Sequence, residues 1–227
     1  MSIKDNVEYI SKKKNEAAER GGQKGDEVLL VAVTKLHSPD EINQAIDAGI
    51  TDIGENKVQE ILDKYDRVKP VKWHLIGHLQ TNKVKYIIDK VELIHSVDSF
   101  KLAKEIEKRA SEHDKIMDIL VQVNPYEEES KFGIEPDKVE ELISDIKENC
   151  PHIRIKGMMC IAPFFDEPEN TRPVFRMVKE MYDKHSDFSI LSMGMSHDFE
   201  VAIEEGANLI RVGTSIFGNR DYRSEER

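Results

Sequence analysis

Eight short apolar runs alternate along the chain with segments that have helical spacing. The first run, LLVAVTK at 29–35, is rich in β-branched residues, and the turn signal HSPD follows it. Such a run is typical of a strand buried on both faces, the form found in parallel sheets. Because no hairpin signal such as Asn-Gly separates the runs, they predict βαβ units with right-handed crossovers.

Eight such units predict a closed (β/α)8 TIM barrel in the α/β class, with an open doubly wound sheet as the alternative. We expect the later strands at 51–54, 72–76, 92–97, 117–124, 153–159, 188–193 and 209–212. Helices are expected at about 38–49, 55–65, 81–88, 98–112, 136–149, 169–185 and 198–205. The whole chain, 1–227, is expected to form one domain, in which 219–227 is a polar tail.

An extra amphipathic helix is expected at 3–20, ahead of the first strand, and a glycine-rich loop then runs to residue 25. Lys12, Lys13 and Lys14 are expected on the solvated face of this helix. Together, residues 1–25 form the predicted N-terminal helix and loop of the domain.

The composition limits the classes of partner. Lys plus Arg is 33 and Asp plus Glu is 44, so the formal net charge of −11 argues against nucleic-acid binding through a basic face. No run has the length of a membrane span, and the start of the chain has no signal-type apolar core. Cys150 and Cys160 have no metal-ligand spacing. We therefore expect a metal-free protein of the reducing cytoplasm.

Lys35 ends the first apolar run. Strand alternation places Lys35, Val33 and Val31 on one face, and Thr34, Ala32 and Leu30 on the other. If the first set faces the barrel interior, the amine lies at the mouth of a dry aliphatic shaft. Desolvation there would favour the neutral amine that a Schiff-base lysine requires. The alternative is a strand-end lysine that reaches water.

Two glycine-containing segments follow the seventh and eighth strands, where barrel enzymes commonly bind phosphate. In MGMSHDFE, Gly194 frees the backbone, Ser196 supplies a hydroxyl, and residues 196–198 are expected to start a helix with outward-pointing amides. In RVGTSIFG, Gly213 lets an anion approach the main chain and Thr214 adds a hydroxyl and an amide. Ordinary helix capping explains either segment alone, but both together favour a phosphate site.

Arg211 shares its strand parity with Gly213 and is expected to face inward. A buried arginine needs a partner because it cannot lose its charge. An inward acid would serve, but none is obvious on the neighbouring strands, so an acceptor on a ligand is favoured. A lysine, a phosphate cradle and an inward arginine suggest a phosphorylated aldehyde. Pyridoxal 5′-phosphate fits, with its aldehyde at Lys35 and its ring nitrogen facing Arg211.

Other polar residues are expected around the same mouth. Glu55 and Asn56 follow the second strand, and His74 and His78 flank the end of the third. The two histidines straddle Gly77 and would not share a helix face, so zinc is not expected. His74, on a strand, is expected to be a core residue with its hydrogen bonds satisfied.

Seven ordered motifs carry a resemblance to a known family. VAVTK, DIGENKVQE, WHLIGHLQTNK, LVQVN, GMM, LSMGMSHDFEVAI and RVGTSIFG, over about 28–218, closely resemble the YggS/PROSC family of pyridoxal-phosphate homeostasis proteins. That family is similar in fold to the amino-terminal barrel of alanine racemase, the type III fold of pyridoxal-phosphate proteins. The resemblance implies the following site: Lys35 as the Schiff-base lysine, Asn56 beside the cofactor, Ser196, Gly213 and Thr214 at the phosphate, and Arg211 at the pyridine nitrogen.

The implied function is a carrier that holds pyridoxal 5′-phosphate and passes it to apo-enzymes, with no catalytic residue assigned. A pyridoxal-phosphate-dependent amino-acid racemase is the alternative, and a Schiff-base aldolase acting on a sugar phosphate is a third. An arginine opposite the ring nitrogen cannot give it a proton, so the ring is a weaker electron sink. A C-terminal β domain carrying a tyrosine acid/base is not expected, and only Tyr126 falls near a strand's carboxyl end. A monomer is expected.

Overall fold

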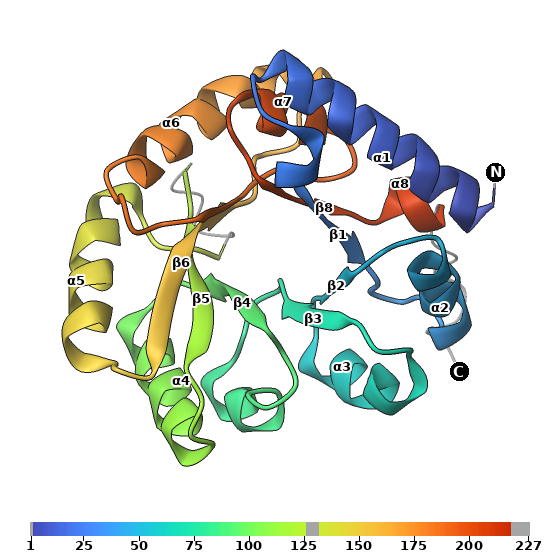
Figure 1. Cartoon of the computed structure of the whole chain (residues 1–227). Helices are drawn as coiled ribbons and strands as arrows, with labels where there is room; N and C mark the ends of the chain where they lie inside the picture. Colours follow the sequence, from blue (N-terminus) through green and yellow to red (C-terminus); the bar gives the residue numbers. More distant parts are fainter. Residues whose placement is uncertain (1, 126–131, 219–227) are drawn as a thin grey trace.

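Eight parallel strands close into a barrel that helices surround (Figure 1). The computed structural model describes residues 2–125 and 132–218. Each strand pairs with its neighbour in chain order, and the first strand also pairs with the last. The strands are β1 (Leu29–Val33), β2 (Asp52–Glu55), β3 (Lys72–Leu75), β4 (Leu93–Val97), β5 (Met117–Val123), β6 (Ile153–Cys160), β7 (Ile190–Ser192) and β8 (Leu209–Val212). The predicted closed (β/α)8 barrel is confirmed, and the open doubly wound alternative is wrong.

The helices lie on the outside of the barrel (Figure 1). They are α1 (Ile3–Arg20), α2 (Pro39–Asp47), α3 (Val58–Lys64), α4 (Phe100–Glu112), α5 (Val139–Asn149), α6 (Arg172–Tyr182), α7 (Phe199–Glu204) and α8 (Thr214–Phe217). Short 3-10 turns complete the connections: η1 (Gly25–Glu27), η2 (Tyr65–Arg67), η3 (Thr81–Tyr86), η4 (Pro136–Lys138) and η5 (Pro168–Thr171).

The segment expected as a helix at 81–88 forms only the 3-10 element η3. Within η3 only Val84 is buried, although Ile87 and Ile88 just after it are buried too, whereas α4 buries Leu102, Ala103, Ile106 and Ala110. Most of the stability of a protein helix comes from packing an apolar stripe. The apolar stripe at 81–88 is confined to Val84, Ile87 and Ile88, about one turn, and the segment forms a 3-10 element, so its interpretation as an α-helix is wrong in type.

The start of α2 shows how local sequence sets the boundary of an element. The hydroxyl of Ser38 accepts a hydrogen bond from the amide of Glu41 at 3.3 Å, and the carboxylate of Glu41 accepts one from the amide of Ser38 at 2.8 Å. Pro39 occupies the first helical position, where its missing N–H costs nothing. This capping box satisfies two amides that the helix itself leaves without partners.

Two apolar layers lie on the two faces of the sheet. The inner layer is built from Val31, Leu93, Leu120, Met159 and Leu209, and the larger outer layer lies between the sheet and the helices. Leu30 and Ala32 belong to the outer layer, whereas Val31 belongs to the inner one. The predicted alternation along β1 is therefore confirmed. By the same parity, Val33 and then Lys35 continue the inward-facing row toward the carboxyl end of the barrel.

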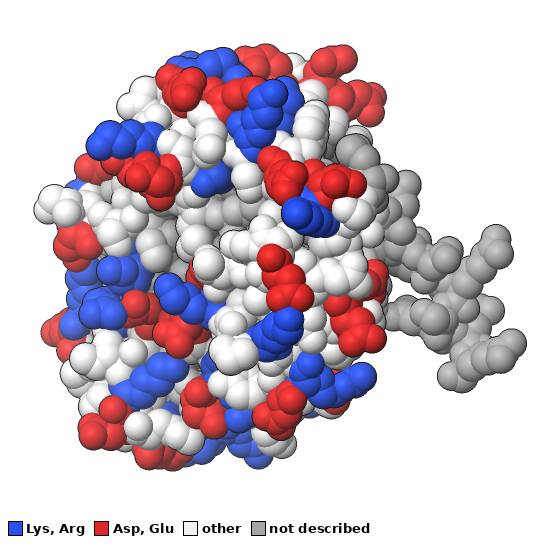
Figure 2. All heavy atoms as spheres, turned by 45° about the vertical axis from the view of Figure 1, so that its right-hand side comes forward, with Lys and Arg blue, Asp and Glu red and all other residues white. Residues whose placement is uncertain are grey.

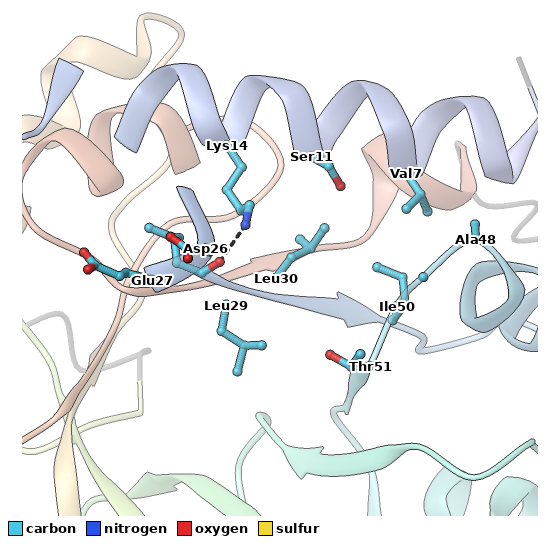
Figure 3. A pocket seen from close by; sticks show the side chains of 12 residues that line it. Val7, Ser11, Lys14, Asp26, Glu27, Leu29, Leu30, Ala48, Ile50 and Thr51 are labelled. Atoms are coloured by element: carbon cyan, nitrogen blue, oxygen red, sulfur yellow. Dashed lines mark hydrogen bonds between the residues drawn. The ribbon is translucent and has the colours of Figure 1, made fainter. Parts of the chain in front are cut away.

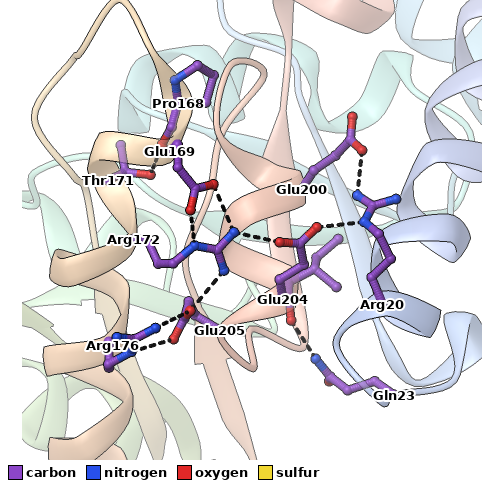
Figure 4. A network of polar contacts seen from close by, with 11 residues as sticks. Arg20, Gln23, Pro168, Glu169, Thr171, Arg172, Arg176, Glu200, Glu204 and Glu205 are labelled. Atoms are coloured by element: carbon purple, nitrogen blue, oxygen red, sulfur yellow. Dashed lines mark hydrogen bonds and ion pairs between the residues drawn. The ribbon is translucent and has the colours of Figure 1, made fainter.

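Helix α1 lies beside α7 and α8 on the outside of the barrel (Figure 1). An ion-pair network joins it to α6 and α7 (Figure 4). The carboxylate of Glu204 lies 2.6 Å from Arg20 of α1 and 2.6 Å from Arg172 of α6. Arg20 also contacts Glu200 at 2.8 Å. One carboxylate on α7 therefore links two arginines from helices that are far apart in the sequence.

Lys14, expected on the solvated face of α1, is half-buried. Its ammonium donates to the carbonyl oxygens of Gly25 at 2.6 Å and Val28 at 2.8 Å, at the edge of a cavity of about 300 Å³ that Val7 and Ser11 also line (Figure 3). The prediction for Lys14 is wrong because carbonyl groups of the loop leading into β1 need a donor on this side.

Charges of both signs alternate over the face of the molecule in Figure 2, without a patch of one sign. Within 2–125 and 132–218, no helix is both long and apolar enough to cross a bilayer. The polar tail predicted at 219–227, and Tyr126, lie outside the described residues.

Candidate functional site at the barrel mouth

The segments that follow β7 and β8 meet at the carboxyl ends of the strands. The amide of Gly213 donates to the hydroxyl of Ser196 at 3.2 Å, and the hydroxyl of Thr214 lies 3.4 Å from the same oxygen. The side chain of Thr214 is exposed, whereas that of Ser196 is half-buried. The structure thus brings together the three residues that the sequence proposes for a phosphate, and two hydroxyls and an amide converge there.

Gly213 packs directly against β1. A Cβ atom at this position would lie 3.1 Å from the Cβ of Val33 and 3.2 Å from its carbonyl oxygen, tighter than most Cβ contacts. Glycine therefore allows β8 to end close beside β1. Because Lys35 lies two residues beyond Val33 on the same strand parity, the cradle of Ser196, Gly213 and Thr214 adjoins the segment that carries Lys35.

Lys35 itself lies two residues after the end of β1 and is half-buried. The amide of Thr34 still pairs with the carbonyl of Gly54 at 3.0 Å, so the strand geometry persists to that residue. Leu36 then adopts a left-handed backbone conformation with φ of +65°. The chain consequently leaves the barrel directly after the lysine.

Asn56 follows β2 and is half-buried near the same end of the barrel. Gly77, after β3, packs on it: a Cβ atom at Gly77 would lie 2.4 Å from the carbonyl oxygen of Asn56. Asn56 and His78 also line a shallow cavity of about 330 Å³ beside η3. His78 stacks on Phe132 with ring centroids 3.8 Å apart, which connects the segments after β3 and β5.

Glu55 does not lie at the mouth, and its prediction there is wrong. It is the last residue of β2, and α3 begins only at Val58. Its side chain is fully buried, and it accepts hydrogen bonds from the hydroxyl of Thr34 at 2.8 Å and the ammonium of Lys64 at 2.8 Å. The reason is strand parity, because residue 55 has the parity of Ile53 in the outer layer. Burial raises the pKa of Glu55, although Lys64 opposes the shift.

Arg211 is buried and faces inward, as predicted. Its guanidinium donates to the hydroxyl of Ser192 and, at 2.8 Å, to the carbonyl oxygen of Cys160. Neither partner is an acid. The protein itself accepts two of the hydrogen bonds of Arg211, and a further acceptor on a ligand stays a prediction.

A chain of hydrogen bonds continues from Ser192 across the barrel interior. The hydroxyl of Ser192 lies 3.1 Å from Nδ1 of His95, and Nε2 of His95 lies 2.9 Å from Nδ1 of His74. Nε2 of His74 then lies 2.9 Å from the carboxylate of Asp52. With both rings neutral, every donor in this chain points from Arg211 toward Asp52, since a guanidinium can only donate. His74 is a satisfied buried residue, as predicted.

The electrostatics of this interior chain follow from its burial. Burial holds the pKa of His95 well below its ordinary value, and the neighbouring His74 and the cationic Arg211 act in the same direction. Burial opposes ionisation of Asp52, but hydrogen bonds from His74 and Thr51 keep the pKa of that carboxyl below its ordinary value. The sequence motifs did not single out His95, Ser192 or Asp52. Their shared inward strand parity with Arg211 and Val31 is the signal that could have found them.

The segment before α7 also differs from its prediction. The helix begins at Phe199 and not at Ser196. Asp198 is its N-cap residue, and the carboxylate of Asp198 accepts a hydrogen bond from the amide of Met195 at 2.7 Å, which holds the residues before the helix in a turn. Burial raises the pKa of Asp198, while that amide and Arg211 act in the opposite direction. Ser196 therefore lies in the turn before the helix, with its hydroxyl directed to Gly213. Within the described ranges, no group of three or more His, Cys, Asp or Glu side chains could hold a metal ion.

Known proteins are similar in sequence to this chain over nearly its full length. The family described as alanine racemase, N-terminal domain, matches residues 12–221. The pyridoxal phosphate homeostasis protein of Aquifex aeolicus is 42% identical over 229 residues, which cover 98% of this chain and 100% of that protein. The chain belongs to the family of pyridoxal phosphate homeostasis proteins. The resemblance seen in the sequence motifs is therefore confirmed.

Solved structures extend the family comparison. PipY of Synechococcus elongatus, a structure described as having pyridoxal phosphate bound, is 32% identical with a TM-score of 0.80 and covers 89% of this chain and 100% of its own. Alanine racemase from Corynebacterium glutamicum is 15% identical with a TM-score of 0.70, and the match covers 97% of this chain and 64% of the racemase. The second likeness establishes only the shared barrel. The predicted alanine racemase N-terminal-like fold is confirmed, and the roles of individual site residues in this family member stay predictions.

Proposed function

We propose that this protein binds pyridoxal 5′-phosphate at the barrel mouth and serves intracellular homeostasis of that cofactor by holding it and passing it to apo-enzymes. The observation that carries the proposal is the convergence of Ser196, Gly213 and Thr214 beside the strand end that leads to Lys35. Membership of a family whose curated members are named for pyridoxal phosphate homeostasis supports it.

The residues present fit the cofactor. The cradle offers two hydroxyls and the Gly213 amide to a phosphate dianion, and hydrogen bonds to charged acceptors are about twice as strong as neutral ones. The missing Cβ of Gly213 lets β8 end close beside β1, which brings the cradle next to the segment that carries Lys35. Lys35 would supply the amine that condenses with the aldehyde with loss of water, Asn56 lies on the neighbouring strand end, and Arg211 would supply a fixed cation for the ring nitrogen.

Arg211 supports a holding role over a catalytic one. When bound, the cofactor supplies an electrophilic aldehyde and a conjugated ring that accepts electrons best when its nitrogen is protonated. Arg211 remains a cation and cannot give its proton away, and Ser192 and the Cys160 carbonyl hold its guanidinium in place. The protein thereby restrains carbanion chemistry at the ring. A racemase would also use a tyrosine as acid/base. Tyr65 and Tyr182, two of the described tyrosines, instead pack on Trp73 and Phe188 in the outer layer.

The first experiment locates the covalent bond. The protein is mixed with pyridoxal 5′-phosphate, reduced with borohydride, digested and mapped by mass spectrometry. We expect the label on Lys35, and we expect Lys35→Ala to lose both the label and the visible absorbance band. Lys57→Ala is the matched control, because Lys57 is an exposed lysine next to Asn56. A label on another lysine, with Lys35 unmodified, would overturn the proposal.

A second experiment separates carrier from racemase. Loaded protein is incubated with an apo-enzyme that needs the cofactor, and recovery of that enzyme's activity is compared with recovery from the same amount of free cofactor. In parallel, single enantiomers of amino acids are followed by chiral chromatography. The carrier proposal expects transfer without racemisation, whereas turnover of at least ~1 per second would favour the racemase.

We further propose that the protein acts as a monomer in the cytoplasm. Cys150 and Cys160 are both buried free thiols, which suits a reducing compartment. Light scattering coupled to size-exclusion chromatography gives the mass in solution. A dimer mass would contradict the first part of this proposal, and recovery from a secreted fraction would contradict the second.

A further inference from the structure

A buried ion cluster lies directly behind Lys35, on the outer side of the barrel wall. It consists of Glu55 at the end of β2, and Glu60 and Lys64 on α3. Glu55 is fully buried, and the side chain of Lys64 is only 10% exposed. The ammonium of Lys64 donates to Glu55 at 2.8 Å and to Glu60 at 2.7 Å. No part of the proposed cofactor site uses these three groups.

The cluster holds both peptide units that flank Lys35. The third proton of the Lys64 ammonium goes to the carbonyl oxygen of Thr34 at 2.9 Å, on the peptide unit before Lys35. The carboxylate of Glu60 accepts from the amide of Leu36 at 2.7 Å, on the peptide unit after it. Fixing these two peptide planes fixes the backbone dihedral angles of the residue between them, and with them the direction of its Cα–Cβ bond.

Two further contacts strengthen this arrangement. The hydroxyl of Thr34 donates to Glu55 at 2.8 Å, so the side chain of the preceding residue is also bound to the cluster. Leu36 has a φ of +65°, a conformation that leucine rarely adopts without an outside constraint. The bond from its amide to Glu60 supplies that constraint.

Stability alone does not account for such a cluster. Removing two carboxylates and an ammonium from water is costly, and well-packed apolar side chains often serve stability as well or better. We propose that Glu55, Glu60 and Lys64 are positioning residues that hold the backbone of Lys35 so that its amine is directed into the barrel mouth. This inference rests on the proposed function, since it concerns the aim of the amine that bonds the cofactor.

The test compares total and covalent binding of pyridoxal 5′-phosphate. Total binding is measured by equilibrium dialysis, and the covalent fraction by borohydride reduction and peptide mapping at Lys35. For Glu60→Ala and Lys64→Met, we expect total binding to change by less than about threefold, because the phosphate cradle is intact. The covalent fraction at Lys35 should fall about tenfold, the loss expected for one hydrogen bond to a charged group.

Conservative and remote variants sharpen the comparison. Glu60→Gln keeps an oxygen that can accept from the Leu36 amide, and we expect it to restore most of the covalent fraction. Lys115→Met is the matched control, because Lys115 also donates to two carbonyl oxygens, those of Ile88 and Val91, but lies before β5 at the other end of the barrel. It should leave both quantities unchanged.

An independent measurement uses the protein without cofactor. Hydrogen exchange of the Leu36 amide, followed by NMR, should become at least about tenfold faster in Glu60→Ala, since its acceptor is lost. Unchanged exchange would overturn the inference. So would an unchanged covalent fraction in Glu60→Ala with wild-type labelling at Lys35, or an equal fall in total and covalent binding. A wild-type label at another lysine would instead overturn the proposed function itself, and if Lys64→Met does not fold, Glu60→Ala carries the comparison.

Discussion

Nδ1 of His74 and Nε2 of His95 lie 2.9 Å apart inside the barrel, and neither ring has access to solvent beyond a few per cent. Two adjacent buried imidazoles can share one hydrogen bond only if one of the two nitrogens is unprotonated. The hydrogen bond between the two rings therefore forms only when one of the two facing nitrogens carries no proton.

Stability should consequently depend on pH through His95. Its pKa in the folded protein is well below the ordinary value of 6.5, mainly because of burial. Below about pH 6.5 the unfolded chain binds a proton that the folded chain does not, so the free energy of unfolding falls as the pH drops. We expect urea unfolding between pH 7.5 and 5.5 to show a slope of up to ~1.4 kcal/mol per pH unit from this group.

The control for this prediction is a pair of variants. His95→Gln should flatten the slope, whereas His113→Gln, at an exposed position after α4, should leave it as in the wild type. Equal slopes in the wild type and His95→Gln would contradict the assignment of the pH dependence to His95.

Gly157 should tolerate no side chain. Its φ is +154°, and a Cβ atom there would lie 1.8 Å from the carbonyl oxygen of Ile190, its partner in β7. We expect Gly157→Ala to lower the free energy of unfolding by more than ~3 kcal/mol or to prevent folding, because β6 and β7 must separate. Gly22→Ala, at φ of +74° with open space around it, should cost only about 1 kcal/mol in the same urea titration. Similar losses at both positions would show that the close contact is relieved cheaply.

Arg172 should contribute more to the stability of the protein than an isolated surface ion pair does, because it joins helices on the outside of the barrel. It contacts Glu204 at 2.6 Å and Glu205 at 2.9 Å, and it lowers the pKa of both carboxyls against the opposing effect of burial. We expect Arg172→Met to lower the free energy of unfolding by ~1 kcal/mol in dilute buffer. The loss should be smaller in about half-molar salt, because salt screens the attraction between surface charges. Lys69→Met, which breaks one exposed pair with Asp47, should have at most half this effect. A loss at Arg172 that is independent of salt would point to packing instead.

The hydroxyls of the proposed phosphate cradle should each contribute to cofactor affinity. We expect Ser196→Ala and Thr214→Val each to weaken total binding of pyridoxal 5′-phosphate about tenfold, because each removes one hydrogen bond to a charged acceptor. The two changes together should cost less than the product, since Ser196 and Thr214 contact one another. Ser99→Ala, which removes the N-cap of α4, should reduce stability but leave binding unchanged. Full affinity in both cradle variants would rule out this phosphate site.

Sequence patterns predicted the inward row of β1 well because side chains on a strand alternate with a fixed period of two. The same rule placed Arg211 inside the barrel. The alternation rule could not predict the hydrogen-bond partners of Arg211. One partner is the backbone carbonyl of Cys160, and a backbone carbonyl has no sequence signature. The register of β6 against β5 also shifts between Ile119 and Leu120, so simple counting of inward positions fails beyond that point.

Glu55 shows a different limit. A carboxylate at the end of an apolar run is typical of a residue at the barrel mouth. The neighbouring sequence does not indicate that the ammonium of Lys64, nine positions later, forms an ion pair with it. Such a pairing depends on where α3 packs against the strands. Local spacing therefore predicted which segments meet at the barrel mouth, whereas the buried polar partners became evident only from the folded arrangement.

The pairing of β1 with β8 has a consequence for how the protein is made. Leu29 lies opposite Leu209, so the ring is sealed only after synthesis has passed the eighth strand. Until then both outer strands of the nascent sheet expose unpaired backbone groups, which can recruit strands from other chains. Once sealed, the sheet has no edge to offer. Vulnerability to aggregation is thereby confined to the interval before the two ends of the sheet meet.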